Sequence, residues 1–377
     1  MERHMDPLMD EMPLRGIRVI DATSNIAGPF GGAILGDLGA DVIKVERPQG
    51  DPSRSMVPLD GSRSAYFHIV NRNKELTVVD LKSESGRIAL HELLENADVF
   101  ISNFLPHQLV DLGLTTEYMR ATFPKLIIGN LSSYGPVGVD ANRPGYDATI
   151  QARTGIMAIT GEADGEPVRT GVSVLDMGAG TWLALGVLAA LVKRERFGTG
   201  SVIETSLYET GVTWVSYHLS SYQISHEPSQ RVGAAHPTFS PYGLFQAADG
   251  KVCIGVGSDI VYKRLTELID RPELFDDARF NTNKGRVTNR AILHAEIESA
   301  LADHSVSYWV EKLGSGGVPV DALRLPEDLL NDPQARDLGM LLQNPDPQSK
   351  VPLIPAIPLR INGVRPPIRK SAPRTES

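Results

Sequence analysis

Short apolar runs alternate with amphipathic stretches over residues 16–130. The apolar runs at 16–21, 41–46, 76–81, 98–102 and 125–130 predict buried strands, and stretches such as 86–96 predict helices between them. Strands that are joined through a helix lie parallel in one sheet, with a right-handed crossover. The pattern therefore predicts an α/β fold, with a Rossmann-like, doubly wound large domain over residues 1–225.

The rest of this domain has a less regular pattern. Residues 145–160 have a helical pattern, and 161–172 are predicted to form a loop or hairpin. Residues 178–193 are apolar on nearly every face and predict a buried helix. A short strand at 201–205 and a helical stretch to residue 225 complete the domain.

A change of composition separates the second part of the chain. Residues 226–241 are rich in His, Pro, Ser, Arg and Gly, which is typical of a linker. A hairpin at 242–257 and helices at 259–269, 287–303 and 305–314 then predict a smaller α/β domain over residues 226–325. Residues 326–377 are expected to return to the large domain, with a loose end over 366–377.

Composition narrows the class of protein. The chain has 377 residues, 41% hydrophobic and 22% charged, with a net charge of −9. An acidic chain of this kind is unlike a nucleic-acid-binding protein, which needs a basic surface. The apolar run at 182–192 is too short to span a membrane, and the scattered His residues lack the spacing of a metal site.

The one cysteine bears on the cellular compartment. Cys253 excludes an intrachain disulfide, and the alternating run around it predicts a strand with a buried, inert thiol. We therefore expect a cytoplasmic protein that has no metal, nucleic-acid or membrane partner.

Asp176 is the most informative single residue, because it stands at the start of the predicted apolar helix. An acidic side chain there has two possible uses. It can cap the free N–H groups of the first turn, or it can be a carboxylate that the helix dipole keeps ionised. The second use suits a nucleophile, because only the anion attacks.

Two further features suggest a ligand at the first strands. Gly28–Gly36 follows a strand, and Glu46 ends the next one, which resembles a site for NAD. No G-x-G-x-x-G fits, however, and Pro29 lacks an N–H for the pyrophosphate. Basic residues form the other feature: Arg47 ends the second strand, and Arg72, Lys74 and Lys82 flank the third. Arg47 and Lys82 would lie at the carboxyl ends of strands, where they are either phosphate ligands or part of a solvated rim.

Ordered motifs along residues 13 to about 340 resemble the family III CoA-transferases, the family of formyl-CoA transferase, carnitine CoA-transferase and the α-methylacyl-CoA racemases. The longer motifs are PLRGIRVID at 13–21, LGADVIKVER at 38–47, NRNK at 71–74, PGYD at 144–147 and TSLYE at 205–209. Shorter ones lie at 27–29, 66–67, 80–82, 97–99, 103–104, 236–237, 241–243 and 317–319.

The resemblance implies roles for particular residues. Asp176 falls on the family's nucleophile and Tyr146 on an active-site tyrosine. The residues that would line coenzyme A are Ala27, Arg47, Val79, Lys82, Asn103 and Phe104. Asp111 stands where the family usually has an arginine, so a phosphate contact is lost or supplied elsewhere. The resemblance also implies an interlocked homodimer.

Two chemistries are known on this fold. The racemases move an α-proton with a histidine directly before an acid, and this chain has Tyr146 before Asp147. A phenol keeps its proton at neutral pH and is a poor general base there. The predicted function is therefore transfer of CoA from an acyl-CoA thioester to a small carboxylic acid.

The expected reaction passes through an aspartyl anhydride and an aspartyl-CoA thioester, without a covalently bound cofactor. Backbone N–H groups near 178–180 and 233–236 are candidates for stabilising the oxyanions. An α-methylacyl-CoA racemase, an NAD-dependent oxidoreductase and a non-catalytic CoA-binding module remain the alternative predictions.

Overall fold

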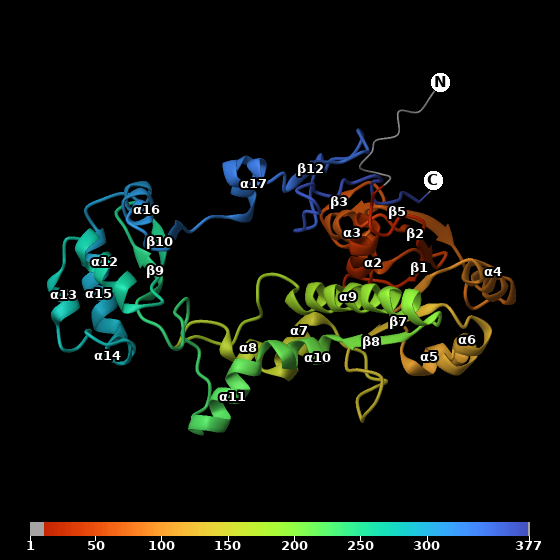
Figure 1. The fold of residues 1–377 in the computed structure, drawn as a ribbon, viewed down its shortest axis with the longest axis horizontal. Helices are drawn as coiled ribbons and strands as arrows, with labels where there is room; N and C mark the ends of the chain where they lie inside the picture. Colours follow the sequence, from red (N-terminus) through yellow and green to blue (C-terminus); the bar gives the residue numbers. More distant parts are fainter. Residues whose placement is uncertain (1–10, 376–377) are drawn as a thin grey trace. The chain divides into compact units, whose positions relative to one another are not determined.

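The computed structural model describes residues 11–375 and divides into two compact units (Figure 1). The first unit contains residues 11–156, 169–226 and 330–375, and the second contains 157–168 and 227–329. The chain thus leaves the first unit and returns to it twice. Each unit has its own sheet and its own core.

A parallel sheet forms the centre of the first unit, with strand order β5-β2-β1-β6-β7-β8. The strands are β1 (Arg18–Ala22), β2 (Asp41–Glu46), β5 (Lys74–Val78), β6 (Val99–Ser102), β7 (Ile127–Ser132) and β8 (Val202–Ser206). The chain builds outward from β1 first to one side and then to the other, which confirms the predicted doubly wound α/β fold. The order reverses between β1 and β6, where open sheets of this type bind ligands.

Helices cover both faces of this sheet. On one face, α4 (Glu84–Glu95) and α6 (Thr116–Thr122) pack on apolar side chains such as Ile20, Phe100 and Ile128. On the other face lie α2 (Ala27–Asp37) and α9 (Val174–Phe197), which pack closely on each other (Figure 1). The remaining elements of this unit are η1 (Pro52–Ser55), β3 (Leu59–Asp60), β4 (Arg63–Ser64), α3 (Ala65–Val70), α5 (Pro106–Asp111), α7 (Asp147–Thr154), α10 (Leu207–Trp214), α11 (Ser216–Ser225), α17 (Pro333–Asp337), β12 (Leu341–Gln343) and β13 (Leu353–Pro355).

Helix α9 has 24 residues and begins four positions before the predicted start at 178. By length and composition it is apolar enough to cross a membrane, so the expectation from residues 182–192 was wrong on length. Half of its most apolar stretch is buried. It packs on α2, β7 and β8, as the core helix of a soluble protein does.

The second unit is a smaller α/β unit. The predicted hairpin is confirmed as β9 (Tyr242–Gln246) and β10 (Lys251–Gly255), and β11 (Val320–Ala322) adds a third antiparallel strand. Its helical elements are α12 (Asp259–Leu268), α13 (Glu273–Asp276), α14 (Asn283–Thr288), α15 (Arg290–Leu301), α16 (Val306–Ser315) and η2 (Pro326–Asn331), with α8 (Ile156–Ile159) at the first junction between the units.

Two sequence expectations were wrong in this part of the chain. Cys253 is exposed, because Val252 and Ile254 take the inward positions of β10 and a strand alternates its side chains. The predicted helix at 287–303 is two helices, which Asn289 separates.

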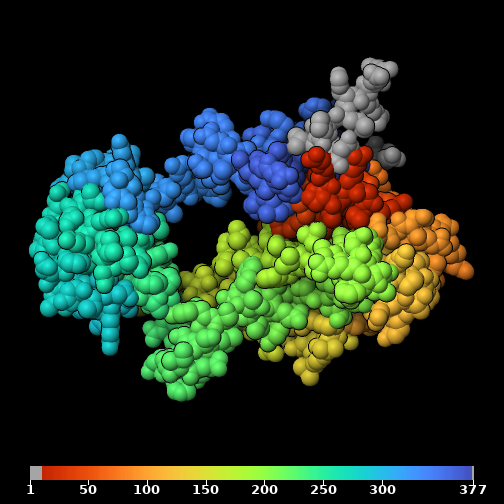
Figure 2. Space-filling model, in the orientation of Figure 1, coloured from red at the N-terminus to blue at the C-terminus, as the bar shows by residue number. Residues whose placement is uncertain are grey.

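The end of the chain was expected to be loose, but the described residues 366–375 are bound to the first unit. The Asn73 backbone N–H donates to the Lys370 carbonyl at 2.9 Å. The Asn73 side chain accepts from the N–H groups of Arg369 and Lys370. Ala372 is buried. Figure 2 shows the C-terminal segment in dark blue against residues near the N-terminus in red. Residues 376–377 lie outside the described part.

Candidate active site

The residues that were assigned to CoA follow strands that are neighbours in the sheet. They are Ala27 after β1, Arg47 after β2, Val79 and Lys82 after β5, and Asn103 and Phe104 after β6. Because β5, β2, β1 and β6 are parallel and adjacent, their following segments meet along one carboxyl edge. The fold therefore places these residues on a single edge of the sheet.

Asn103 lies on this edge between β1 and β6, where the strand order reverses. Its Nδ2 donates to the Ser24 carbonyl at 2.9 Å, and its Oδ1 accepts from the Ser24 N–H at 3.0 Å. The side chain thus joins the segment after β6 to the segment after β1. Two of its four hydrogen-bonding positions are taken by the protein backbone, and these two bonds fix the shape of the edge here.

The two basic residues that were expected at the carboxyl edge, Arg47 and Lys82, are available to a ligand. Arg47 and Lys82 are exposed, and the Arg47 Nε donates to the Gly50 carbonyl at 2.9 Å. Arg72 and Lys74 are buried and paired with Asp37 and with Asp21. Burial lowers the pKa of Lys74 to about 8, although the Asp21 carboxylate opposes that shift.

The glycines after β1 allow two helices to approach each other. A Cβ on Gly31 would lie 2.9 Å from the Gly180 carbonyl oxygen, and a Cβ on Gly180 would lie 2.4 Å from the Ala27 carbonyl oxygen. A Cβ on Gly32 would meet the Asp21 carboxylate at 2.5 Å. Gly31 and Gly32 lie inside α2 and Gly180 lies inside α9, where they serve packing, so the resemblance of this turn to an NAD site was misleading.

Asp176 lies in the first turn of α9, not before it. The capping interpretation is wrong, because another acid takes the free N–H groups there. The Oδ2 atom of Asp147, on α7, accepts from the backbone N–H of Leu175 at 2.8 Å and from that of Asp176 at 3.3 Å. Asp147 is therefore the anion at the start of this helix, and the Asp176 side chain is left for another purpose.

The surroundings of Asp176 oppose its ionisation. Its side chain is half-buried, and burial together with the nearby Asp147 charge raises the pKa of Asp176 to about 7. The expectation that the helix dipole holds it ionised at all neutral pH values is therefore too simple. A carboxylate that is poorly solvated and beside a like charge is a more reactive nucleophile.

Helices α2 and α9 connect Asp176 to the carboxyl edge that carries the residues expected to bind CoA, which we call the CoA edge. Gly180 lies one turn after Asp176 on α9, on the same face of the helix. That face meets α2 at Ala27, which is the first residue after the β1 edge segment. The contact between α2 and α9 thus relates the position of the carboxylate to that of the edge.

Sequence reasoning missed Asp147 and Gln151 as residues of this site. The Gln151 Nε2 donates to Asp147 Oδ1 and, at 3.0 Å, to Thr170 Oγ1, and its Oε1 accepts from the Thr170 N–H. Helix α7 therefore holds both the loop before α9 and the first turn of α9. The available signal was the position of Asp147 directly after Tyr146, which is exposed at the start of α7.

The expected oxyanion donors at 178–180 are not available. These residues lie inside α9, where their N–H groups take part in the helix. Residues 233–236 belong to the second unit.

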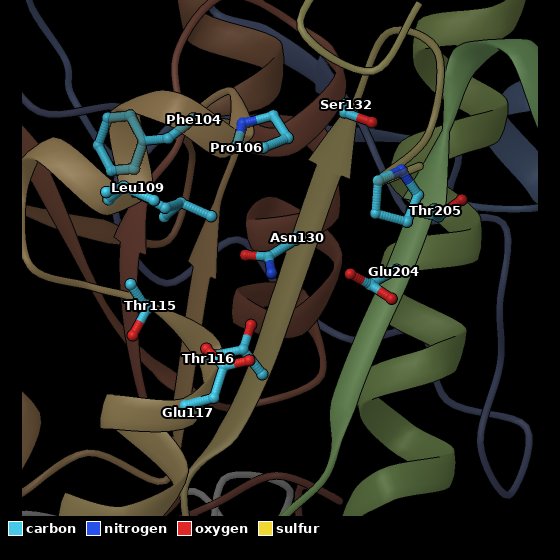
Figure 3. Close-up of a pocket in the computed structure, with 12 residues that line it drawn as sticks. Phe104, Pro106, Leu109, Thr115, Thr116, Glu117, Asn130, Ser132, Glu204 and Thr205 are labelled. Atoms are coloured by element: carbon cyan, nitrogen blue, oxygen red, sulfur yellow. The ribbon is translucent and has the colours of Figure 1, made fainter. Parts of the chain in front are cut away.

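A cavity of about 220 Å³ lies beside β7 and β8, near Phe104 (Figure 3). Its other lining residues include Leu109, Asn130, Glu117 and Glu204. Leu109 belongs to α5, the helix that ends at Asp111, where the family arginine is absent. Within residues 11–375, no three His, Cys, Asp or Glu side chains are grouped as a metal site requires.

Comparisons with known proteins agree on one family. A family model described as CoA-transferase family III matches residues 14–377. The acetyl-CoA:oxalate CoA-transferase of Acetobacter aceti is 36% identical over 98% of this chain and 95% of its own. The succinyl-CoA:glutarate CoA-transferase of Mus musculus is 35% identical over 88% of this chain and 76% of its own.

A solved structure gives the same result. The crystal structure of a CAIB/BAIF family protein from Brucella suis has a TM-score of 0.85 to this chain, is 35% identical and covers 96% of both chains. The fold, the matched length and the sequence identity agree with the motifs found along the sequence. The chain therefore belongs to CoA-transferase family III.

Proposed function

We propose that this protein transfers CoA from an acyl-CoA thioester to a small carboxylic acid, with Asp176 as the nucleophile. The observation that carries the proposal is the half-buried Asp176 carboxyl at the start of α9, which Asp147 relieves of any capping role. The edge with Arg47 and Lys82 supplies cationic groups for the phosphates of CoA.

The reaction needs only this carboxylate and the two substrates. The Asp176 carboxylate attacks the thioester carbonyl, the C–S bond breaks, and a mixed anhydride and the CoA thiolate result. The thiolate attacks the aspartyl carbonyl and releases the donor acid, which leaves an aspartyl-CoA thioester. The acceptor carboxylate then attacks this thioester, and the released thiolate takes the acceptor acyl group from the new anhydride. The Asp176 carboxylate is thereby regenerated.

The chemistry and the names of the relatives support a substrate class. Each step exchanges one activated acyl group for another of similar energy, so water must be kept away from the anhydride. Relatives of this chain are named for oxalate and glutarate, and another for mesaconate. We propose a small dicarboxylate as the acceptor, and a cytoplasmic homodimer as the working form.

Trapping of the covalent intermediate tests this proposal. Purified protein is incubated with acetyl-CoA or succinyl-CoA, treated with hydroxylamine or borohydride, and digested for mass spectrometry. We expect one modified peptide, at Asp176 and not at Asp147 or Glu209. Asp176→Asn keeps the side-chain shape and removes the nucleophilic anion, so it is expected to abolish transfer and labelling. An active Asn variant would refute the nucleophile assignment.

A further inference from the structure

Two backbone segments form the part of the carboxyl edge next to β1 and β2. Residues 23–26 connect β1 to α2 and lead into Ala27. Residues 47–51 follow β2 and carry Arg47. Neither segment is helix or strand, so the regular backbone hydrogen bonds of such an element do not fix them, and side-chain contacts matter more for their conformation.

A buried ion pair lies beneath both segments. Lys44 on β2 and Asp51 are 2.8 Å apart, and their side chains are 0% and 1% exposed. The Lys44 ammonium also donates to the carbonyl of Thr23 at 3.1 Å. One cation therefore contacts the segment after β1 through the backbone and the segment after β2 through a carboxylate.

The Asp51 carboxylate completes this connection. Its Oδ1 accepts from the backbone N–H of Asn25 at 3.1 Å and from the N–H and hydroxyl of Ser53 at 2.8 and 2.7 Å. Its own N–H donates to Glu46 at 3.1 Å. Burial would raise the pKa of Asp51, but the Lys44 charge and the Ser53 hydrogen bonds outweigh it and hold that pKa below its usual range.

Burying two charges costs solvation free energy, so the place where the folded chain does so is informative. Two charges taken out of water gain little net stability, and apolar residues of similar volume often serve a core as well or better. This pair instead spends its hydrogen bonds on Thr23 and Asn25, in an irregular segment of the proposed CoA edge. Asn25 has a φ of 67°, a left-handed conformation that needs support from its surroundings.

We propose that the Lys44–Asp51 pair is a positioning device that fixes residues 23–26 and 47–51 in the geometry that binds CoA. This inference rests on the proposed function, because it takes the carboxyl edge as the CoA site. Segments that are ordered before the ligand arrives lose less conformational freedom on binding. Removal of the pair should therefore weaken CoA binding more than it slows the chemical step.

Isothermal titration of full-length protein with free CoA measures this effect directly. Lys44→Met and Asp51→Asn are expected to raise the Kd for CoA about tenfold or more, because a mispositioned binding group loses most of its contact. The kcat at saturating thioester is expected to change less than threefold. Asp51→Asn is the milder change, because it keeps the oxygen that faces Asn25.

Asp37 and Arg72 provide a matched control. This pair is also buried, with both side chains 3% exposed and their closest atoms 2.6 Å apart. Asp37 is the last residue of α2, which starts at Ala27, so the pair lies a helix length of about 15 Å from the carboxyl edge. Arg72→Met should therefore lower the thermal stability as much as Lys44→Met and leave the Kd for CoA within twofold.

A double variant separates positioning from stability. Lys44→Met/Asp51→Leu buries no unpaired charge and should recover much of the stability that Lys44→Met loses. It cannot restore the hydrogen bonds to Thr23 and Asn25, so its Kd for CoA should remain raised. Recovery of wild-type CoA affinity in this variant would overturn the proposal.

The remaining outcomes also discriminate. If Asp51→Asn binds CoA as tightly as the wild type, or if Arg72→Met weakens CoA binding as much as Lys44→Met, the pair has no positioning role. If the wild-type protein itself does not bind CoA, the proposed function fails. That result is distinct, because it appears before any variant is compared.

Discussion

At the scale of single residues, Asp147 and Asp176 differ in their surroundings and therefore in what each carboxyl group can do. The Asp147 carboxylate accepts hydrogen bonds from the backbone N–H groups of residues 175 and 176 and from the side-chain amide of Gln151. Asp176 has no such support, and the nearby Asp147 charge adds to the effect of burial. If Asp176 is the nucleophile, as we propose, it is protonated at low pH and reacts as an anion at higher pH.

The pH dependence of the reaction should report this carboxyl group. Because the pKa of Asp176 is raised to about 7, kcat/KM for the thioester should rise as the pH increases through about 7 and become constant above it. Asp147→Asn removes the repelling charge, so the rise should move to lower pH. The measurement is kcat/KM from pH 5 to 9 in both proteins, with buffers of constant ionic strength. A rise that moves to higher pH in the variant would contradict the assignment.

The same group should affect stability with a defined sign. A carboxyl whose pKa rises on folding, from 3.8 to about 7, favours the folded state most below pH 4. This contribution is lost as the pH increases through about 7. The Asn side chain of Asp176→Asn does not titrate. The unfolding free energy of this variant should therefore exceed that of the wild type at pH 8, and this difference should be smaller at pH 4. Urea unfolding at the two pH values measures the difference, and a larger gain at pH 4 would contradict the raised pKa.

Arg47 is the residue that we propose most directly as a contact for the CoA phosphates. It is exposed directly after β2, and a contact to a phosphate far from the reacting carbonyl would contribute equally to the ground and transition states. Arg47→Ala should raise the KM for the thioester about tenfold with little change in kcat. Arg120→Ala, an exposed arginine on α6, is the control and should change neither constant. A fall in kcat at constant KM would exclude this role for Arg47.

At the scale of elements, apolar runs located the strands because a parallel sheet is buried on both faces. The start of α9 was missed because the acid that supports it, Asp147, is 28 residues before Leu175 in the sequence. The basic residues Lys44, Arg72 and Lys74 are usually read as surface groups. Their acidic partners come from other elements, so only the folded chain shows them as buried pairs.

The contact of α2 with α9 relates the carboxyl edge, where we propose that CoA binds, to Asp176, and the close approach of the two helices depends on glycine. A Cβ on Gly180 would lie 2.4 Å from the carbonyl oxygen of Ala27, so Gly180→Ala must separate the helices. The cost should be about 1–3 kcal/mol of unfolding free energy, as for other overpacked cores. Activity at saturating substrates should fall as well, because Asp176 moves with α9.

Gly171 offers the matched control for this substitution. A Cβ there meets nothing within 4 Å, and Gly171 is not among the residues with a positive φ. Gly171→Ala should therefore leave stability and activity close to wild type, although it lies only a few residues before Asp176. Thermal unfolding and initial rates of both variants test the prediction, and equal effects at the two positions would show that the helix contact is not the cause.

At the scale of the whole molecule, three helices of the first unit expose large apolar side chains that nothing else in residues 11–375 of the single chain covers. Large apolar side chains on α9, α10 and α11 are exposed, namely Trp182 (42%), Leu185 (52%), Trp214 (41%), Tyr217 (47%) and Tyr222 (52%). Soluble monomers seldom expose many such side chains on neighbouring elements, and patches of this kind mark interfaces. The chain crosses from one unit to the other more than once, near residues 156, 168, 226 and 330, which is compatible with the interlocked dimer that the sequence resemblance implies.

We therefore predict that the protein is a homodimer that does not dissociate on dilution. Subunits that pass through each other cannot separate without unfolding, so the dimer should persist at nanomolar concentration and part only in the unfolding transition. Light scattering at micromolar concentration and mass photometry at nanomolar concentration measure the two limits. Trp182→Asp/Leu185→Asp should hinder assembly, whereas Ile88→Asp, which changes an exposed apolar residue on α4, should not. A wild-type monomer at either concentration would exclude the interlocked form, and the exposed helices would then need another partner.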